Sequence, residues 1–167
     1  ISMSSNHSAD YDVIAVGAGF AGISLSYHLR EAGLNVKVFD RASDVGGTWA
    51  WNKYPGAATD SESYYYCLTF SKEVLQEWSW SKRYSGWEET QKYLKFVMDK
   101  FSLWPMFQLS TEVESAEFDN ETGLWNVRTQ GGETHTAKYF VSAMGMISQP
   151  VLPNISGQDR FNGHIFH

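Results

Sequence analysis

Three glycines near the amino terminus have the spacing of a turn that can bind a phosphate group. They are Gly17, Gly19 and Gly22, and they enclose Phe20 and Ala21. The first glycine permits a tight turn, the second lets the backbone approach a pyrophosphate, and the third allows a helix to pack closely on a strand. Unpaired N–H groups at the start of that helix favour an anion. The pattern predicts a dinucleotide-binding turn, although glycines alone could also form an ordinary turn.

An acidic residue, Asp40, stands 23 positions after Gly17. A carboxylate there can accept hydrogen bonds from adenosine ribose hydroxyls, and it would repel a 2′-phosphate. The turn is therefore expected to bind FAD or NAD rather than NADP, and the glycines cannot distinguish the first two. The alternative is that Asp40 is a solvated strand end. The neighbouring Arg41 either stacks on an adenine or faces water, and both readings stay open.

The segment 46–60 combines paired glycines, two tryptophans and a carboxylate. Paired glycines let a backbone pass close to a large ligand. Trp49 and Trp51 offer flat apolar walls that suit an isoalloxazine ring, and Asp60 delivers a negative charge beside them. The alternative is that both tryptophans are core residues. The segment shows neither helical nor strand periodicity, which favours a ligand-binding loop.

This segment closely resembles a signature of the Baeyer–Villiger monooxygenases. The signature is a small residue and glycine, a tryptophan, an aromatic–proline pair, a glycine and an aspartate, and here it runs from Gly46 to Asp60. Two weaker likenesses accompany it. Ser142–Gly145 resembles the segment by which such flavoproteins return to FAD, and Phe161–His167 resembles the start of a motif shared with related flavin monooxygenases. The resemblance extends from Tyr11 to the end of the chain.

The resemblance implies a set of cofactor contacts. The implied flavin contacts are Gly47, Thr48, Trp49, Trp51, Asp60, Tyr66, Val113 and Gly145. Ala58, Thr59 and Asp60 would lie close to bound NADP. Asp60 is the implied catalytic residue, because in the family it lies beside an arginine that assists oxygen transfer. That arginine would lie beyond His167.

The implied reaction is the insertion of an oxygen atom next to a ketone carbonyl, which gives an ester or lactone. FAD, NADPH, O₂ and a small ketone would take part, and the ketone cannot be identified. The sequence has no second glycine fingerprint, so we expect the NADPH domain to be absent and this chain alone to be inactive. The alternatives are an N- or S-oxygenating flavin monooxygenase, a flavoprotein dehydrogenase, and a non-catalytic flavin-binding module.

The elements that must position these residues form an α/β pattern. A strand–turn–helix–strand unit is expected over 11–16, 20–32 and 36–39, with a parallel sheet. Ser85 and Glu88 form a capping box that predicts a helix to about Phe101, with Leu94, Val97 and Met98 inward. Turn signals then separate an antiparallel meander over 112–118, 124–129 and 133–137, followed by a parallel strand over 139–143.

The expected fold is therefore a Rossmann-like FAD-binding domain with a parallel sheet and an antiparallel β-meander, incomplete relative to the full family fold. Residues 1–10 are expected to form a flexible leader and 11–167 the domain. The missing returning strand would leave an exposed edge, so the chain is expected to self-associate.

The composition of the chain excludes several kinds of binding partner. The net charge of -6, from 13 basic and 19 acidic residues, provides no basic surface for nucleic acid. No segment is apolar enough to span a membrane, and no metal site is expected. The single cysteine, Cys67, cannot form an internal disulfide and is interpreted as a buried hydrophobe, which fits a cytoplasmic location.

Overall fold

The computed structural model describes residues 8–165, and these form a six-stranded sheet with the order β3-β2-β1-β6-β5-β4. β3, β2, β1 and β6 run parallel, whereas β6, β5 and β4 are antiparallel. The predicted fold class is confirmed. The strands are β1 (Tyr11–Val16), β2 (Val36–Phe39), β3 (Phe107–Gln108), β4 (Val113–Asp119), β5 (Leu124–Thr129) and β6 (Thr134–Ser142).

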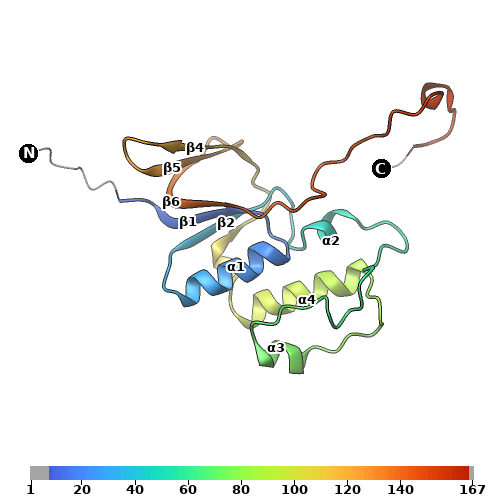
Figure 1. Cartoon of the computed structure of the whole chain (residues 1–167), viewed down its shortest axis with the longest axis horizontal. Helices are drawn as coiled ribbons and strands as arrows, with labels where there is room; N and C mark the ends of the chain where they lie inside the picture. The colour runs from blue at the N-terminus through green and yellow to red at the C-terminus, as the bar shows by residue number, and fades with distance from the viewer. Residues whose placement is uncertain (1–7, 166–167) are drawn as a thin grey trace, which may run out of the picture.

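The α-helices lie together on one side of the sheet (Figure 1). They are α1 (Phe20–Glu31), α2 (Thr48–Trp51), α3 (Lys72–Glu77) and α4 (Trp87–Lys100), with two 3-10 turns, η1 (Trp104–Met106) and η2 (Gln158–Arg160). Gly33 ends the turn after α1 with φ +81°, the left-handed conformation that was predicted. The helices α2 and α3 and the short strand β3 were not predicted.

Alternation along β1 and β2 divides the core into two layers. Val13 and Val38 face α1, where Leu25 and Leu29 pack against them. The opposite face of the sheet, with Ile14 buried at its centre, packs against the meander. A third cluster lies between α1 and α4, and the predicted apolar face of α4 is confirmed within it. The sheet is therefore covered on both faces, by α1 on one and by the meander on the other.

One strand takes the place of two predicted ones. The sequence predicted separate strands over 133–137 and 139–143, but β6 is continuous. Its first half pairs antiparallel with β5 and its second half pairs parallel with β1. The two patterns meet at Ala137, which has partners on both sides. Residues 138–142 consequently have a strand neighbour only on the β1 side within the part of the chain that the structure describes.

The predicted capping box of α4 is wrong. The N-cap residue is Gly86, and no side chain caps this helix. Ser85 is fully buried, and its hydroxyl lies 3.1 Å from that of Thr90. Its carbonyl accepts a hydrogen bond from the backbone of Thr59, so Ser85 belongs to a tertiary contact rather than to a local cap.

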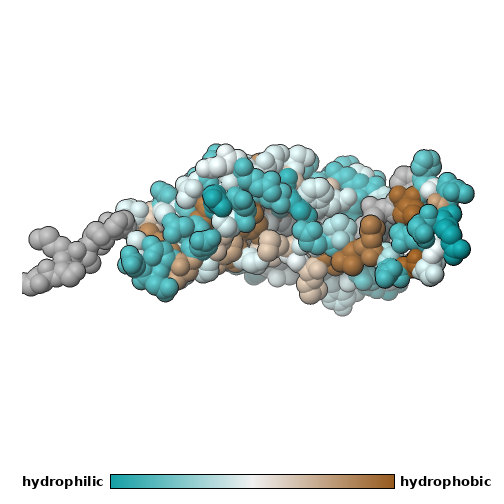
Figure 2. Space-filling view, turned by 90° about the horizontal axis from the view of Figure 1, so that it is seen from above, coloured by the Kyte–Doolittle hydropathy of each residue, from teal (hydrophilic) through white to brown (hydrophobic). Residues whose placement is uncertain are grey.

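The two ends of the described chain differ from each other: the first is bound to the sheet, and the last extends away from it. The Asp10 carboxylate accepts hydrogen bonds from the backbone and hydroxyl of Thr136, at 2.7 and 2.8 Å, which joins residue 10 to β6. Residues after Ser142 leave the sheet as an extended segment (Figure 1), and apolar side chains along it, such as Met146 and Val151, are exposed (Figure 2). Residues 1–7 of the expected leader, and His167, lie outside the described residues. Within residues 8–165, no helix is long and apolar enough to cross a membrane.

Candidate dinucleotide site

The glycine turn connects β1 to α1 and packs against the end of β6. Gly17 has φ +119°, and a Cβ placed on it would lie 2.3 Å from the carbonyl oxygen of Ala143. A Cβ on Gly22 would lie 1.8 Å from the carbonyl oxygen of Gly17. Both positions therefore require glycine for reasons of space, and Gly17 also for its backbone conformation.

The N-terminus of α1 has free hydrogen-bond donors. Its N-cap is Gly19, whose side chain can provide no cap, and no acidic residue lies in the first turn of α1. The first N–H groups of a helix have no partner within the helix. Those of Phe20 and Ala21 are consequently available, together with the positive end of the helix dipole, for an anion such as a phosphate.

A second glycine loop meets this turn. The Gly46 N–H donates to the carbonyl of Ala18 at 2.9 Å. Gly47 has φ +56°, and a Cβ on it would lie 3.0 Å from the Cα of Gly19. The two glycine loops thus touch through their backbones. The paired glycines permit this contact. The close backbone approach that the sequence predicted toward a ligand therefore occurs between the two loops.

The two tryptophans of this loop have different surroundings. Trp49 is buried, and its Nε1–H donates to the Tyr66 hydroxyl at 3.1 Å. The Tyr66 ring in turn packs edge-on against Phe20, with centroids 4.9 Å apart. Trp51 is instead 55% exposed. The structure therefore brings Phe20, Trp49 and Tyr66 together beside the glycine turn, and it leaves Trp51 at the surface.

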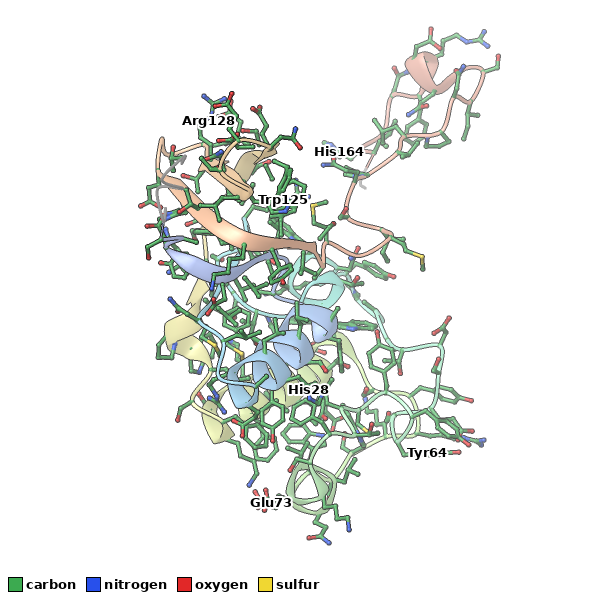
Figure 3. All side chains as sticks on the ribbon, turned by 60° about the vertical axis from the view of Figure 1, so that its left-hand side comes forward. His28, Tyr64, Glu73, Trp125, Arg128 and His164 are labelled. Atoms are coloured by element: carbon green, nitrogen blue, oxygen red, sulfur yellow. The ribbon has the colours of Figure 1, made fainter. Side chains whose placement is uncertain are left out.

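A buried tyrosine supports this aromatic wall from α4. Tyr93 is fully buried and stacks on Phe20 with ring centroids 6.1 Å apart. Burial raises the pKa of Tyr93 to about 12, although its hydroxyl accepts a hydrogen bond from the Leu68 N–H at 2.7 Å. The phenol is therefore neutral at physiological pH. In contrast, Tyr64, a few residues before Leu68, lies away from α1 (Figure 3).

The segment around Asp60 is held against the start of α4. Ala58 pairs with Gly86 in an isolated bridge, and the Thr59 N–H donates to the Ser85 carbonyl at 2.9 Å. Thr59 is buried, and within residues 8–165 its hydroxyl has no hydrogen-bond partner. Asp60 is exposed, and its carboxylate receives only a long contact, 3.5 Å, from the Ser61 hydroxyl. No backbone N–H of the described chain binds this carboxylate, which argues against a capping role.

Asp40 lies at the other end of the site, directly after β2. It is only 8% exposed, so it is not a solvated strand end. Its carboxylate oxygens accept hydrogen bonds from the N–H groups of Ala18, at 2.6 Å, and Ala42, at 2.8 Å. The predicted acid is thus in place next to the glycine turn, and its charge is stabilised by backbone donors.

A polar cavity of about 300 Å³ lies beside Asp40, between the residues after β2 and the meander. Arg41, Thr111 and Gln130 are among the residues that line it. Val113 begins β4 next to Thr111, at an irregularity in the pairing with β5. A larger hollow, of about 560 Å³, lies over α3 and α4, and none of the candidate residues line it.

Arg41 is exposed and contacts two other segments of the chain. Its guanidinium lies 5.2 Å from the ring centroid of Trp51 and donates to the carbonyl of Ser148 at 2.7 Å. Arg41 therefore joins the second glycine loop to the segment that follows β6. In that segment Gly145 has φ +76° with open space around it, so its backbone conformation, not crowding, favours glycine.

Sequence reasoning missed the backbone of Ala18, which binds both Asp40 and Gly46. Its side chain has no chemistry that could have revealed the role. The segment Ser142–Gly145 was singled out in the sequence, but the contact between the Ala143 carbonyl and Gly17 was not predicted. Val113 begins β4 and pairs with Thr129, which lines the polar cavity, so Val113 lies at the cavity end of the site rather than at the aromatic wall.

Comparison with known proteins supports the resemblance seen in the sequence. A family model described as pyridine nucleotide-disulphide oxidoreductase matches residues 14–167. A Baeyer–Villiger monooxygenase of Pseudooceanicola batsensis is 46% identical over 160 residues, which are 95% of this chain and 29% of that protein. The phenazine N-monooxygenase PhzNO1 of Lysobacter antibioticus is 46% identical over 166 residues, which are 99% of this chain and 31% of that protein.

The fold agrees with a solved structure of a related protein. The structure of OTEMO in complex with FAD and NADP superposes with a TM-score of 0.87 and 34% identity, over 96% of this chain and 30% of that one. The predicted likeness to Baeyer–Villiger monooxygenases is confirmed. The chain spans about 30% of the length of the relatives that it matches.

Proposed function

The chain belongs to the family of pyridine nucleotide-disulphide oxidoreductases, and from this premise we propose that it is the FAD-binding part of an NADPH-dependent flavin monooxygenase. The proposed reaction inserts an oxygen atom next to a ketone carbonyl and gives an ester or lactone. One observation carries the proposal: two glycine loops meet at the free N-terminus of α1, between a buried acid and an aromatic wall.

The residues present fit FAD, because α1 begins without a side-chain cap, so its first N–H groups can bind an anion, and the buried carboxylate of Asp40 lies next to the glycine turn. The N–H groups of Phe20 and Ala21, with the helix dipole, would hold the pyrophosphate, and Gly17, Gly19 and Gly22 would shape the turn that presents them. Asp40 would accept hydrogen bonds from the ribose. The cavity lined by Arg41, with Val113 beside it, would receive the adenine.

The aromatic wall would hold the flavin ring. Gly47 and Thr48 begin α2 beside the glycine turn, and Trp49 and Tyr66 present apolar surface there. Trp51 and Gly145 would close the site from the exposed side. Bound FAD supplies the redox and oxygen chemistry. The chain contributes orientation and exclusion of water, and the phenol of Tyr93 behind the wall adds no charge because it stays neutral.

The carboxylate of Asp60 would interact with charged or polar groups that bind beside it. Its carboxylate is exposed and is not bound by backbone donors of the described chain, so it can receive a cation or a nicotinamide group. The resemblance to Baeyer–Villiger monooxygenases implies that Ala58 and Thr59 would lie close to bound NADP, and the bridge between Ala58 and Gly86 fixes the backbone there.

A second function has support from one observation. The phenazine N-monooxygenase is as similar to this chain, at 46% identity, as the Baeyer–Villiger enzyme is. An N-oxygenating parent enzyme is therefore the second candidate. The residue four places after His167 would separate the two, because it is a tryptophan in Baeyer–Villiger enzymes. As a third candidate, the chain by itself would be a non-catalytic flavin-binding module.

We place the protein in the cytoplasm, since its single cysteine fits a reducing compartment.

The test is a fluorescence titration of the folded chain with FAD and with NADP. We expect tighter binding of FAD, because the buried carboxylate of Asp40 disfavours a 2′-phosphate. Tighter binding of NADP would contradict the proposal. Product analysis with a ketone and with an aromatic amine, in the complete enzyme, would separate the first two functions.

A further inference from the structure

The carboxylate of Asp40 accepts hydrogen bonds from the chain itself, in addition to any that a ribose could donate. Its two carboxylate oxygens are bound by the N–H groups of Ala18 and Ala42, at 2.6 and 2.8 Å. It is 8% exposed, and it takes part in no ion pair among residues 8–165. These two charge-assisted bonds are therefore what stabilises the buried charge within the described chain.

One of the two donors lies inside the phosphate-binding turn itself. Ala18 is fully buried between Gly17 and Gly19, and its carbonyl accepts a hydrogen bond from the Gly46 N–H at 2.9 Å. The backbone at Ala18 is thus held by Asp40 through its N–H and by the second glycine loop through its carbonyl. Removal of either partner would free the middle of the turn to change shape.

We propose that Asp40 is a positioning residue for the phosphate turn: it binds the Ala18 N–H, holds the turn in its binding shape before any ligand arrives, and leaves the following N–H groups to the anion. This inference rests on the proposed function, since it assumes that the turn receives the pyrophosphate of FAD. It also explains why a carboxylate stands so near an anion site, where its charge alone would oppose binding.

Inorganic pyrophosphate distinguishes this role from a contact with ribose, because it carries no sugar. The variant Asp40→Asn keeps the size of the side chain, but it has one accepting oxygen and no charge. It therefore cannot accept from the N–H groups of Ala18 and Ala42 together, and its bond to either is weaker. If Asp40 binds only a ribose, the variant binds pyrophosphate as well as the wild type, or more tightly because a negative charge is gone. If Asp40 holds the turn, the affinity for pyrophosphate falls at least about 10-fold, the scale of a lost hydrogen bond to a charged group.

The matched control is Asp159→Asn, which removes the same charge from an exposed residue of η2. We expect it to bind pyrophosphate as the wild type does. Titrations followed by amide resonances in NMR spectra give the affinities of all three proteins. Unchanged or tighter pyrophosphate binding by Asp40→Asn would overturn the proposal.

A measurement on the ligand-free wild type tests the bond between Asp40 and the Ala18 N–H even if Asp40→Asn does not fold. An amide proton bonded to a carboxylate resonates downfield, and it moves upfield when acid protonates that carboxylate. We expect this behaviour for Ala18 and not for Gly19 or Phe20. An Ala18 resonance that lies with its neighbours and ignores acid would refute the proposal. A wild type that shows the Ala18 signature and binds neither FAD nor pyrophosphate would instead refute the proposed function.

Discussion

The substitution Gly22→Ala has two opposing effects on the stability of the fold. In an ordinary helix, replacement of glycine by alanine stabilises the helix by about 1 kcal/mol. Gly22 lies in the first turn of α1, and the Cβ of alanine would lie 1.8 Å from the carbonyl oxygen and 3.0 Å from the carbonyl carbon of Gly17. Non-bonded heavy atoms prefer separations of about 3.5 Å. The two groups must therefore move apart by more than about 1 Å.

Neither group can move freely. The Gly17 carbonyl belongs to backbone that β6 confines, because Ala143 lies against the other side of that residue. The Val38 side chain of β2 lies 3.9 Å from the new methyl group, so α1 can retreat only by losing its packing on the sheet. Overpacking of this kind costs about 1–3 kcal/mol or more, which exceeds the gain in helix propensity.

We therefore expect Gly22→Ala to lower Tm, at about 2–4 °C for each kcal/mol in a chain of this size. It should also weaken FAD binding at least about 10-fold, because the displaced turn no longer presents its N–H groups to the pyrophosphate. Thermal melting by circular dichroism and a flavin fluorescence titration on the same preparation measure both effects.

Gly33→Ala is the matched control. Gly33 has φ +81° and no atom within 4 Å of the position of a new Cβ. The variant should lose about 1–2 kcal/mol from backbone strain alone and keep wild-type affinity for FAD. A Gly22→Ala protein that melts at or above the wild-type temperature, with unchanged FAD affinity, would show that the turn tolerates the methyl group and that the reasoning is wrong.

Three other outcomes are expected. In the complete enzyme, Asp60→Ala should bind FAD and melt normally but lose ketone oxygenation by about 100-fold or more; a variant destabilised by about 1 kcal/mol with intact turnover would indicate a cap instead. Burial raises the pKa of the Cys67 thiol, so less thiolate is present at neutral pH and iodoacetamide should label Cys67 more slowly than free cysteine; labelling at the free-cysteine rate would contradict this. Because residues 138–142 of β6 have a neighbour on one side only within the described chain, light scattering should show concentration-dependent association and gel filtration should show loss of FAD. A monomer with stoichiometric flavin would count against that prediction.

The sequence alone was sufficient for the features that depend on neighbouring residues. The strand, glycine turn, helix and strand from Tyr11 to Phe39 were predicted correctly, because apolar runs, helical spacing and the steric freedom of glycine act within a few positions. The same holds for the apolar face of α4 and for the first two strands of the meander. The loop after Gly46 was identified from its residue types, although α2 within it was not.

Only the tertiary structure decided the features that depend on segments far apart in the chain. Ser85 fits a capping box locally, yet it is fully buried: its hydroxyl contacts that of Thr90, and its carbonyl accepts a hydrogen bond from Thr59, 26 positions away. β6 is continuous because β1 and β5 meet it from opposite sides at Ala137, and no local pattern encodes that pairing. Asp40 could be predicted as an acid at a strand end, but its bond to the Ala18 N–H exists only when the turn and the end of β2 come together.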